Sequence, residues 1–167
     1  MSVEEFQTAP KLNACLVLDN IRSMNNIGSA FRTGDAFRVE TIFLTGISAT
    51  PPHRDIHKTA LGATDSVAWR YEKDTLELVK ELKRNDYQIV ALEQADESTA
   101  LPDFDPAPHV KYAFIFGNEV FGVQEEVVNE SDICLEIPQF GTKHSLNISV
   151  SVGVVLWDYF MKVRPDF

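Results

Sequence analysis

Short apolar runs of strand length recur along this chain and alternate with segments of helical periodicity. Between Ala14–Leu18 and Thr41–Leu44, apolar residues fall at helical spacing from Ile27 to Phe37. Parallel strands need a crossover connection, which is usually a helix. We therefore predict an α/β fold with a mainly parallel sheet and helices on both faces. Further strands are predicted at Ser66–Tyr71, Gln88–Glu93, Tyr112–Phe116 and Ile133–Ile137, and further helices after Asp74 and at Gln124–Asn129.

The C-terminal stretch has features of both a strand and a helix. Apolar and small polar residues alternate from Ile148 to Val154, which is typical of a strand. The apolar run then continues to Val163, a length that is unusual for a strand and ordinary for a buried helix. We predict a helix, capped by Asn147 or Ser149.

Length and composition are those of an ordinary globular protein. The 167 residues suit a single domain, and the apolar content is 44%. No apolar run reaches the roughly 18 to 20 residues of a membrane span, and Met1–Glu5 lacks the features of a signal peptide. We expect a cytoplasmic protein. Cys15 and Cys134 each lie in an apolar run and are interpreted as buried free thiols, with a disulfide or reactive pair as the alternative.

Charge argues against a protein that holds nucleic acid by bulk electrostatics, because the net charge is −10. The charge is uneven along the chain. Residues 1–60 are neutral overall, whereas residues 61–110 carry −6 and residues 111–167 carry −4. A patch facing phosphate is therefore expected only in the first third, which contains Arg22, Arg32, Arg38, Arg54 and Lys58.

Three short motifs combine glycine or proline with polar residues next to a predicted strand or helix. They are Asn26–Arg32, Phe116–Gly122 and Ile137–Asn147. In α/β proteins, binding sites form on loops at the carboxyl ends of strands. We expect the three motifs to meet at such a site.

Each motif also has a purely structural explanation. Asn26 is a favoured N-cap residue and Gly28 permits close packing, although a helix N-terminus near Arg32 also suits an anion. Glu119 either binds a hydroxyl or caps the next helix, and a glycine at 117 lets the backbone approach a ligand. Neither the dinucleotide fingerprint G-x-G-x-x-G nor the G-x-x-x-x-G-K-[ST] phosphate loop occurs.

Other candidates are weaker. His53 and His57 have a spacing that binds metal on a helix, but Pro51 and Pro52 precede them and no third ligand is evident, so a loop or surface role is predicted and no metal site. His144 either contacts a ligand or faces solvent. Trp69 and Trp157 are interpreted as core or dimer contacts.

The order and spacing of the three motifs resemble those of the SpoU (TrmH-type) family of RNA ribose 2′-O-methyltransferases, within the SPOUT superfamily. The similarity runs from about Ala14 to Phe160 and includes Lys58–Ala63. The motifs are Asn-x-Gly-x-x-x-Arg at 26–32, Phe-Gly-Asn-Glu-x-x-Gly at 116–122, and Ile-Pro leading to Ser-Leu-Asn at 137–147.

The resemblance implies a C-terminal trefoil knot, which general topology rules would have excluded. It also implies S-adenosyl-L-methionine as cofactor, held in the knot largely through backbone groups, and a homodimer with the motif-one arginine near the partner's cofactor. The implied cofactor-binding residues are Gln94, Gly117, Asn118, Ile137 and Leu146, with Pro138 and Gly141 shaping the pocket.

The implied reaction is methylation of a ribose 2′-hydroxyl in RNA. Arg32 resembles the catalytic arginine, and because a guanidinium stays charged, we assign it to the adjacent phosphate and the developing alkoxide. The other polar positions of the family are Asn26, Glu119, Ser145 and Asn147. Their expected roles are to orient Arg32, contact the ribose and fix the loop.

The chain departs from longer members of the family in two ways. We expect residues 1–167 to form a single domain with no separate RNA-binding extension, and the chain is acidic, so an accessory RNA-binding protein is a possible partner. We predict tRNA as substrate, with rRNA as the alternative. A catalytically silent dimer that binds cofactor or RNA is the second hypothesis, and the retention of Arg32, Ser145 and Asn147 favours an enzyme.

Overall fold

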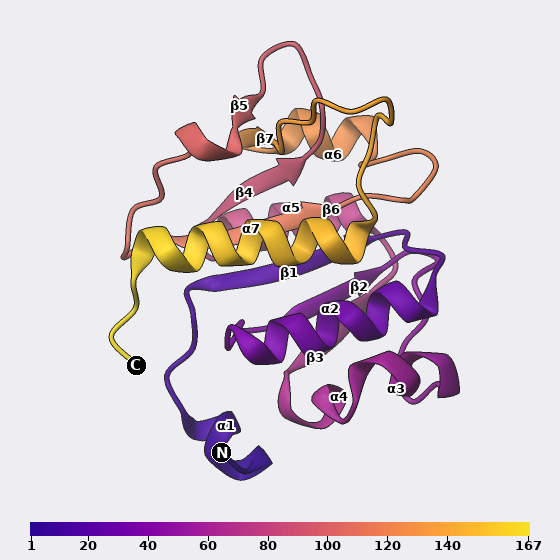
Figure 1. The fold of residues 1–167 in the computed structure, drawn as a ribbon, viewed down its shortest axis with the longest axis vertical. Helices are drawn as coiled ribbons and strands as arrows, with labels where there is room; N and C mark the ends of the chain where they lie inside the picture. The colour runs from indigo at the N-terminus through magenta and orange to yellow at the C-terminus, as the bar shows by residue number, and fades with distance from the viewer.

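Helices and strands alternate along most of the chain, as predicted. The computed structural model describes all residues, 1–167. Figure 1 shows a sheet with helices on both sides. The strands are β1 (Ala14–Asp19), β2 (Ile42–Thr45), β3 (Trp69–Glu72), β4 (Tyr87–Leu92), β5 (Thr99–Ala100), β6 (Lys111–Phe116) and β7 (Ile133–Glu136). The helices are α1 (Val3–Thr8), α2 (Met24–Ala36), α3 (Arg54–Ala60), α4 (Ala63–Ser66), α5 (Thr75–Arg84), α6 (Glu125–Glu130), α7 (Ile148–Val163) and the 3₁₀ turn η1 (Leu101–Asp103).

The sheet has seven strands in the order β3-β2-β1-β6-β4-β7-β5. Every pairing is parallel, which confirms the predicted sheet type. Because all the strands point the same way, their carboxyl ends share one edge of the sheet. The loops that follow β4, β6 and β7 therefore come together there.

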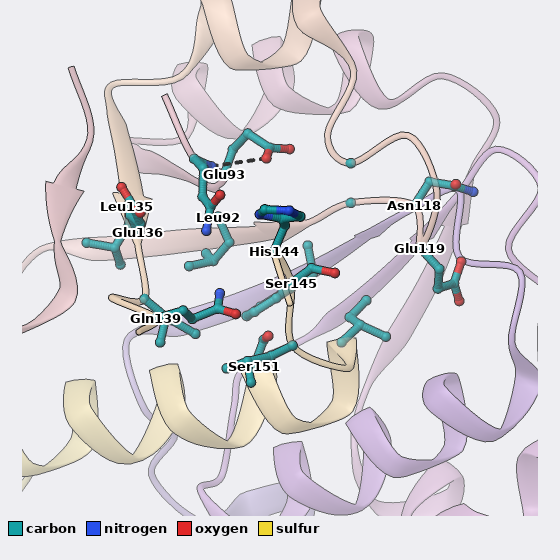
Figure 2. Close-up of a pocket in the computed structure, with 17 residues that line it drawn as sticks. Leu92, Glu93, Asn118, Glu119, Leu135, Glu136, Gln139, His144, Ser145 and Ser151 are labelled. Atoms are coloured by element: carbon teal, nitrogen blue, oxygen red, sulfur yellow. Dashed lines mark hydrogen bonds between the residues drawn. The ribbon is translucent and has the colours of Figure 1, made fainter. Parts of the chain in front are cut away.

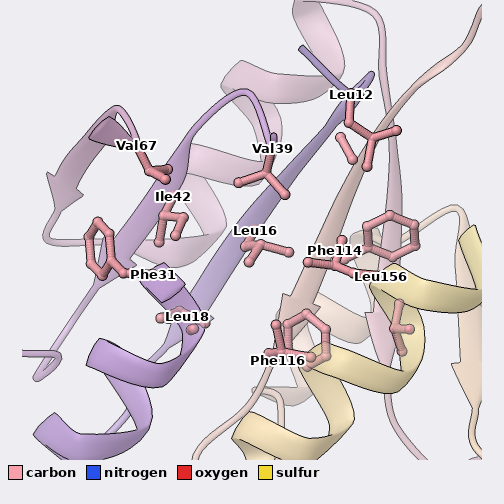
Figure 3. Close-up of a cluster of buried hydrophobic side chains, with 14 of the residues drawn as sticks. Leu12, Leu16, Leu18, Phe31, Val39, Ile42, Val67, Phe114, Phe116 and Leu156 are labelled. Atoms are coloured by element: carbon pink, nitrogen blue, oxygen red, sulfur yellow. The ribbon is translucent and has the colours of Figure 1, made fainter. Parts of the chain in front are cut away.

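Two hydrophobic cores cover the two faces of the sheet. Strand β1 contributes to both, because successive side chains point to opposite faces: Leu16 and Leu18 join the larger core, and Cys15 and Val17 join the smaller one. The larger core lies under α2 and α7 (Figure 3), and the smaller one lies under α5 and α6. The strand is therefore fully buried along its whole length.

The C-terminal stretch forms helix α7, which confirms the prediction of a helix over a strand. Asn147 is its N-cap, and the Asn147 side-chain oxygen accepts a hydrogen bond from the Ser149 N–H at 2.9 Å. Val152, Val155, Leu156 and Tyr159 are buried against the sheet. None of the helices combines the length and the apolarity that crossing a bilayer requires.

Several predicted boundaries were wrong. Helix α2 is capped by Ser23 rather than Asn26, because the Ser23 hydroxyl accepts the Asn26 N–H at 3.2 Å. The strand predicted from Ser66 begins at Trp69, since Ser66 closes helix α4 and its hydroxyl donates to the Ala63 carbonyl. After Pro51 and Pro52 the chain forms helix α3, whereas the two prolines predicted a loop there.

Some side chains also differ from expectation. Cys15 is buried as a free thiol, which confirms that prediction, whereas Cys134 is only half-buried. A core position is wrong for both tryptophans, because Trp69 is 36% exposed and Trp157 is 57% exposed. His53 is the N-cap of α3, and its Nδ1 accepts the Asp55 N–H at 3.1 Å.

Candidate active site

A cavity of about 170 Å³ lies at the carboxyl ends of β4, β6 and β7. Figure 2 shows its lining side chains, which come from the ends of these strands, the loops that follow them and the start of α7. The lining includes seven of the predicted site residues, and none of the seven belongs to motif one. The lining residues are Leu92, Glu93, Gln94, Phe116, Gly117, Asn118, Glu119, Gly122, Leu135, Glu136, Ile137, Gln139, His144, Ser145, Leu146, Ile148 and Ser151.

The loop after β6 is held by hydrogen bonds from one asparagine. The Asn118 backbone exchanges two hydrogen bonds with Gly122, at 3.0 and 2.9 Å. Its side-chain oxygen accepts from the N–H groups of Val120 and Phe121, and its side-chain nitrogen donates to the Asn20 carbonyl at 2.7 Å. These bonds fix the loop on itself and tie it to the end of β1.

The glycines of this loop are needed for packing within the protein. A Cβ on Gly117 would lie 2.1 Å from the Gly122 backbone, and a Cβ on Gly122 would lie 2.2 Å from the Glu93 carboxylate. Gly122 also has a φ of +69°, a left-handed conformation that favours glycine. The absence of a Cβ at Gly117 and Gly122 therefore allows close packing within the chain, whereas the prediction for Gly117 was a close approach of the backbone to a ligand.

Glu119 links this loop to the beginning of α2. Its two carboxylate oxygens accept the N–H groups of Arg22 and Ser23, each at 3.0 Å, and the Asn26 amide at 3.5 Å. Burial raises the pKa of Glu119, but the donated hydrogen bonds from Arg22, Ser23 and Asn26 outweigh it and hold the pKa below its usual value. The Glu119 carboxylate is therefore anionic and already hydrogen-bonded, and it acts as a clamp that holds the loop after β6 to the beginning of α2.

Asn26 joins the first motif to the third. Because Ser23 caps α2, the Asn26 side chain is free to make other contacts, and its oxygen accepts from the Asn147 amide at 3.3 Å. Asn147 in turn accepts from Ser149, as the cap of α7. The chain Glu119–Asn26–Asn147 therefore connects all three motifs, as their spacing predicted.

Arg32 lies outside the cavity of its own chain. It is exposed on α2 and makes no hydrogen bond or ion pair. Arg32 follows Asn26 by six positions, so at 100° per residue the two side chains leave the helix about 120° apart. A single chain thus does not bring Arg32 to the loops that line the cavity.

The loop after β7 contributes Gln139, His144, Ser145 and Leu146 to the cavity. Pro138 and Gly141, predicted to shape the pocket, do not line it, and nothing lies within 4 Å of a Cβ placed on Gly141. Residues 138–146 make no hydrogen bond to any protein group. This loop approaches the cavity without being tied to it.

Two carboxylates of the lining were not predicted. Glu93 follows β4 and accepts the N–H groups of Gln94 and Val123, and Glu136 ends β7 and accepts the Ser98 hydroxyl at 2.7 Å. Their position at the ends of predicted strands was the available signal. With the apolar side chains Leu92, Leu135 and Ile137 nearby, the cavity suits a ligand with a flat apolar part and a positive charge.

Known proteins are similar to this chain in sequence and in fold. The 23S rRNA (guanosine-2′-O-)-methyltransferase RlmB of Neisseria meningitidis is 30% identical over 145 residues, which cover 84% of this chain and 55% of that protein. The structure of a TrmH/SpoU tRNA modifying enzyme of A. aeolicus matches with a TM-score of 0.85 at 23% identity, over 97% of this chain and 81% of that one. An AdoMet-bound rRNA methyltransferase of Sinorhizobium meliloti matches with a TM-score of 0.82 at 23% identity, over 93% and 61%.

These similarities extend over nearly the whole chain but over only part of several relatives. The chain spans between 55% and 67% of the length of the curated relatives that it matches. The model of the family described as "SpoU rRNA Methylase family" matches residues 13–157, which include all three motifs and the cavity. This chain therefore belongs to the SpoU rRNA methylase family.

Proposed function

We propose that the protein methylates a ribose 2′-hydroxyl in RNA, with S-adenosyl-L-methionine as methyl donor. The observation that carries the proposal is the hydrogen-bonded chain Glu119–Asn26–Asn147, which joins the three family motifs beside the cavity. Relatives that match the chain are named as RNA 2′-O-methyltransferases, which supports the same reaction.

The chemistry of the cavity fits this cofactor. Leu135, Ile137 and Leu146 supply apolar surface for a flat adenine ring, and the backbone groups of these loops would read its edge. Glu93 and Glu136 would supply negative charge to a cofactor that carries a sulfonium and an ammonium group. When bound, the cofactor supplies a methyl group activated by the positive sulfur. The residues Gln94, Gly117, Asn118, Ser145 and Gln139 complete the proposed pocket.

Arg32 is assigned to the substrate. A 2′-hydroxyl is a weak acid, so it needs a group that stabilises negative charge as it loses its proton. Arg32 keeps its charge and makes no hydrogen bond or ion pair in its own chain, so its guanidinium is available to hold the adjacent phosphate and the developing alkoxide. Glu119 is not assigned a proton-transfer role, because its oxygens already accept three hydrogen bonds.

A homodimer would complete the site. Helix α7 exposes Val150, Val154, Trp157 and Met161, which are spaced by four, three and four residues and so form one apolar stripe. Helix α2, which carries Arg32, packs beside α7 on the same face of the sheet, and the rings of Phe37 and Trp157 lie 6.3 Å apart. We propose that two α7 stripes pair across a two-fold axis, which would bring Arg32 of each chain near the partner's cavity.

The proposed substrate is tRNA, with rRNA as the alternative, and the proposed location is the cytoplasm. One structural relative is named as a tRNA modifying enzyme, whereas a curated relative is named for 23S rRNA. The acidic net charge of −10 makes an accessory RNA-binding protein a further proposed partner.

The test is incubation of the protein with labelled S-adenosyl-L-methionine and total RNA of its source, followed by nucleoside mass analysis. We expect new 2′-O-methyl nucleosides, and mapping them would identify the RNA. Arg32→Ala should lower the rate about 10²- to 10³-fold while cofactor affinity stays within about twofold. Arg84→Ala is the matched control, because Arg84 is an exposed arginine at the end of α5, makes no ion pair and does not line the cavity. Cofactor binding without any methylated product would support the catalytically silent alternative.

A mixing experiment tests the shared site. Leu146→Arg places a positive charge in the cavity and should abolish cofactor binding, because Leu146 lines it and is 40% exposed. Equal mixing of inactive Arg32→Ala and Leu146→Arg dimers, after reassortment, should restore about a quarter of wild-type activity, since half of the dimers then hold one intact site. No recovery, with reassortment confirmed by mass, would contradict the assignment of Arg32 to the partner's site.

A further inference from the structure

Two phenylalanines are exposed on the loops that line the cavity. Phe140 is 98% exposed and Phe121 is 85% exposed, the highest values among the large apolar side chains of the chain. By contrast, Phe31, Phe114 and Phe116 are at most 2% exposed. Single exposed apolar side chains are common, whereas two aromatic rings on the loops that line one cavity point to a surface that binds another molecule.

Both residues lie on the loops that line the cavity. Phe121 is next to Gly122 in the loop after β6, and Phe140 is next to Gln139 in the loop after β7. The backbone N–H of Phe121 is bonded to the Asn118 side chain at 3.1 Å, so this ring is carried on a fixed loop. Each of the two loops therefore carries one exposed aromatic ring next to a residue that lines the cavity.

Neither ring contributes to the fold. Phe121 and Phe140 make no aromatic pair and no cation–π contact, and neither belongs to a hydrophobic core. Apolar contact with another part of the chain thus does not explain their presence. A phenyl ring also has no polar group that would be satisfied by water.

Each of the two loops also carries or binds a basic residue that makes no ion pair. Lys143 lies on the loop of Phe140, and Arg22 is held to the loop of Phe121 through the bond between its N–H and Glu119. Aromatic rings that accompany basic side chains are the combination that binds unpaired nucleotides, because bases stack on the rings and phosphates contact the cations.

We propose that Phe121 and Phe140 stack on unpaired bases of the substrate RNA on either side of the methylated nucleotide. The proposal rests on the proposed function, since it places a ribose at the cavity between the two rings. A second copy of the chain is a poorer occupant, because the two rings are on separate loops and the continuous apolar stripe of α7 already offers a face for pairing. The site thus selects single-stranded RNA by stacking, without bulk positive charge.

The experiment measures binding of a labelled RNA hairpin with an unpaired loop, and of a fully paired duplex with the same stem. Phe121→Ala and Phe140→Ala should each weaken hairpin binding about tenfold, which is about 1.4 kcal/mol, and leave duplex binding unchanged. Phe140→Trp should restore hairpin binding, whereas Phe140→Leu should not, because leucine is apolar but has no ring to stack. Cofactor affinity and thermal stability should stay at the wild-type level in all four variants.

Leu61→Ala is the control for general loss of exposed apolar surface, because Leu61 is 65% exposed and does not line the cavity. Unchanged hairpin binding in both alanine variants would overturn the stacking proposal and leave the methyl-transfer proposal standing. Rescue by leucine as well as by tryptophan would also overturn it. Loss of the dimer in the alanine variants, measured by mass, would show that the two rings contact a second copy of the chain instead of RNA. Failure of the wild-type protein to bind any RNA would count against both proposals.

Discussion

The two loops that line the cavity are built in different ways. In the loop after β6, Asn118 and Glu119 use nearly every polar atom to brace the loop against β1 and α2. In the loop after β7, residues 138–146 make no hydrogen bond to the protein, and Gly141–Asn147 are exposed. One side of the cavity is thus formed by folding alone, and the other has its polar groups available to a ligand.

Because of this difference, one side of the cavity is fixed before a ligand binds and the other side can adjust to the ligand. A braced loop holds its backbone in place before a ligand arrives, which reduces the entropy lost on binding. An unbraced loop loses more entropy on binding but adjusts to the ligand and can close over it. Four measurements test this difference between the loop after β6 and the loop after β7.

The largest effect is expected for Gly117→Ala in the braced loop. The added Cβ would lie 2.1 Å from the Gly122 backbone, and backbone cannot move aside as a flexible side chain can. We expect a loss of about 3 kcal/mol in the free energy of unfolding, the upper end of overpacking costs, and loss of cofactor binding. Urea denaturation and calorimetric titration measure the two. A variant with wild-type stability would show that the loop is not rigid.

Glu119→Gln should cost about 2 kcal/mol at neutral pH, since the anion accepts hydrogen bonds from Arg22 and Ser23. Because the folded-state pKa of Glu119 lies below the ordinary value of 4.5, its stabilisation is complete above about pH 4.5 and disappears as the pH falls through the lower folded value. The difference between the two proteins should therefore shrink in acid. A difference that stays constant from pH 7 to pH 3, measured by denaturation, would contradict the assigned clamp.

Saturating S-adenosyl-L-methionine should slow trypsin cleavage after Lys143 at least tenfold. This factor corresponds to an increase of about 1.4 kcal/mol in the free energy of opening the loop. Lys143 lies in the unbraced loop and is exposed. Amide exchange at Val120 and Phe121 should change little, because these groups are already bonded to Asn118. Equal protection of both loops would remove the distinction between them.

Gly141→Ala should have the smallest effect and is the counterpart of Gly117→Ala. No atom lies within 4 Å of the new Cβ, and the Gly141 backbone is not in the left-handed region. The free energy of unfolding should change by less than about 0.5 kcal/mol. Thermal unfolding provides the check, and a large loss of stability would mean that the loop packs more closely than it does in the structure.

The architecture was largely predictable from the sequence, because it depends on local apolar patterns. The strand at Ala14–Leu18 and the helix capped by Asn147 are examples, and both are confirmed. Cap choice was not predictable: Ser23 and Asn26 are both favoured cap residues, and only tertiary contacts with Glu119 and Asn147 decide that Asn26 is used elsewhere. The trefoil knot and the single-domain organisation stay predictions.

The site was predictable as a set of motifs but not as a set of contacts. Gln94, Gly117 and Ser145 line the cavity as expected, whereas Pro138 and Gly141 do not. Glu93 and Glu136 were missed because a single carboxylate at a strand end has no distinctive sequence pattern. The exposure of Phe121 and Phe140 was also hidden, since apolar residues in a sequence are ordinarily assigned to the core.

The hydrogen bond between Asn147 and Asn26 joins residues 121 positions apart, and this has a consequence for the timing of synthesis. Ribosomes add about 5 to 20 residues per second, so Asn26 is made about 6 to 24 s before its partner. During that interval the start of α2 exists without the third motif, and the cavity lacks one of its sides. The nascent chain therefore has no complete cavity until the residues up to Ser151, at the start of α7, have been made.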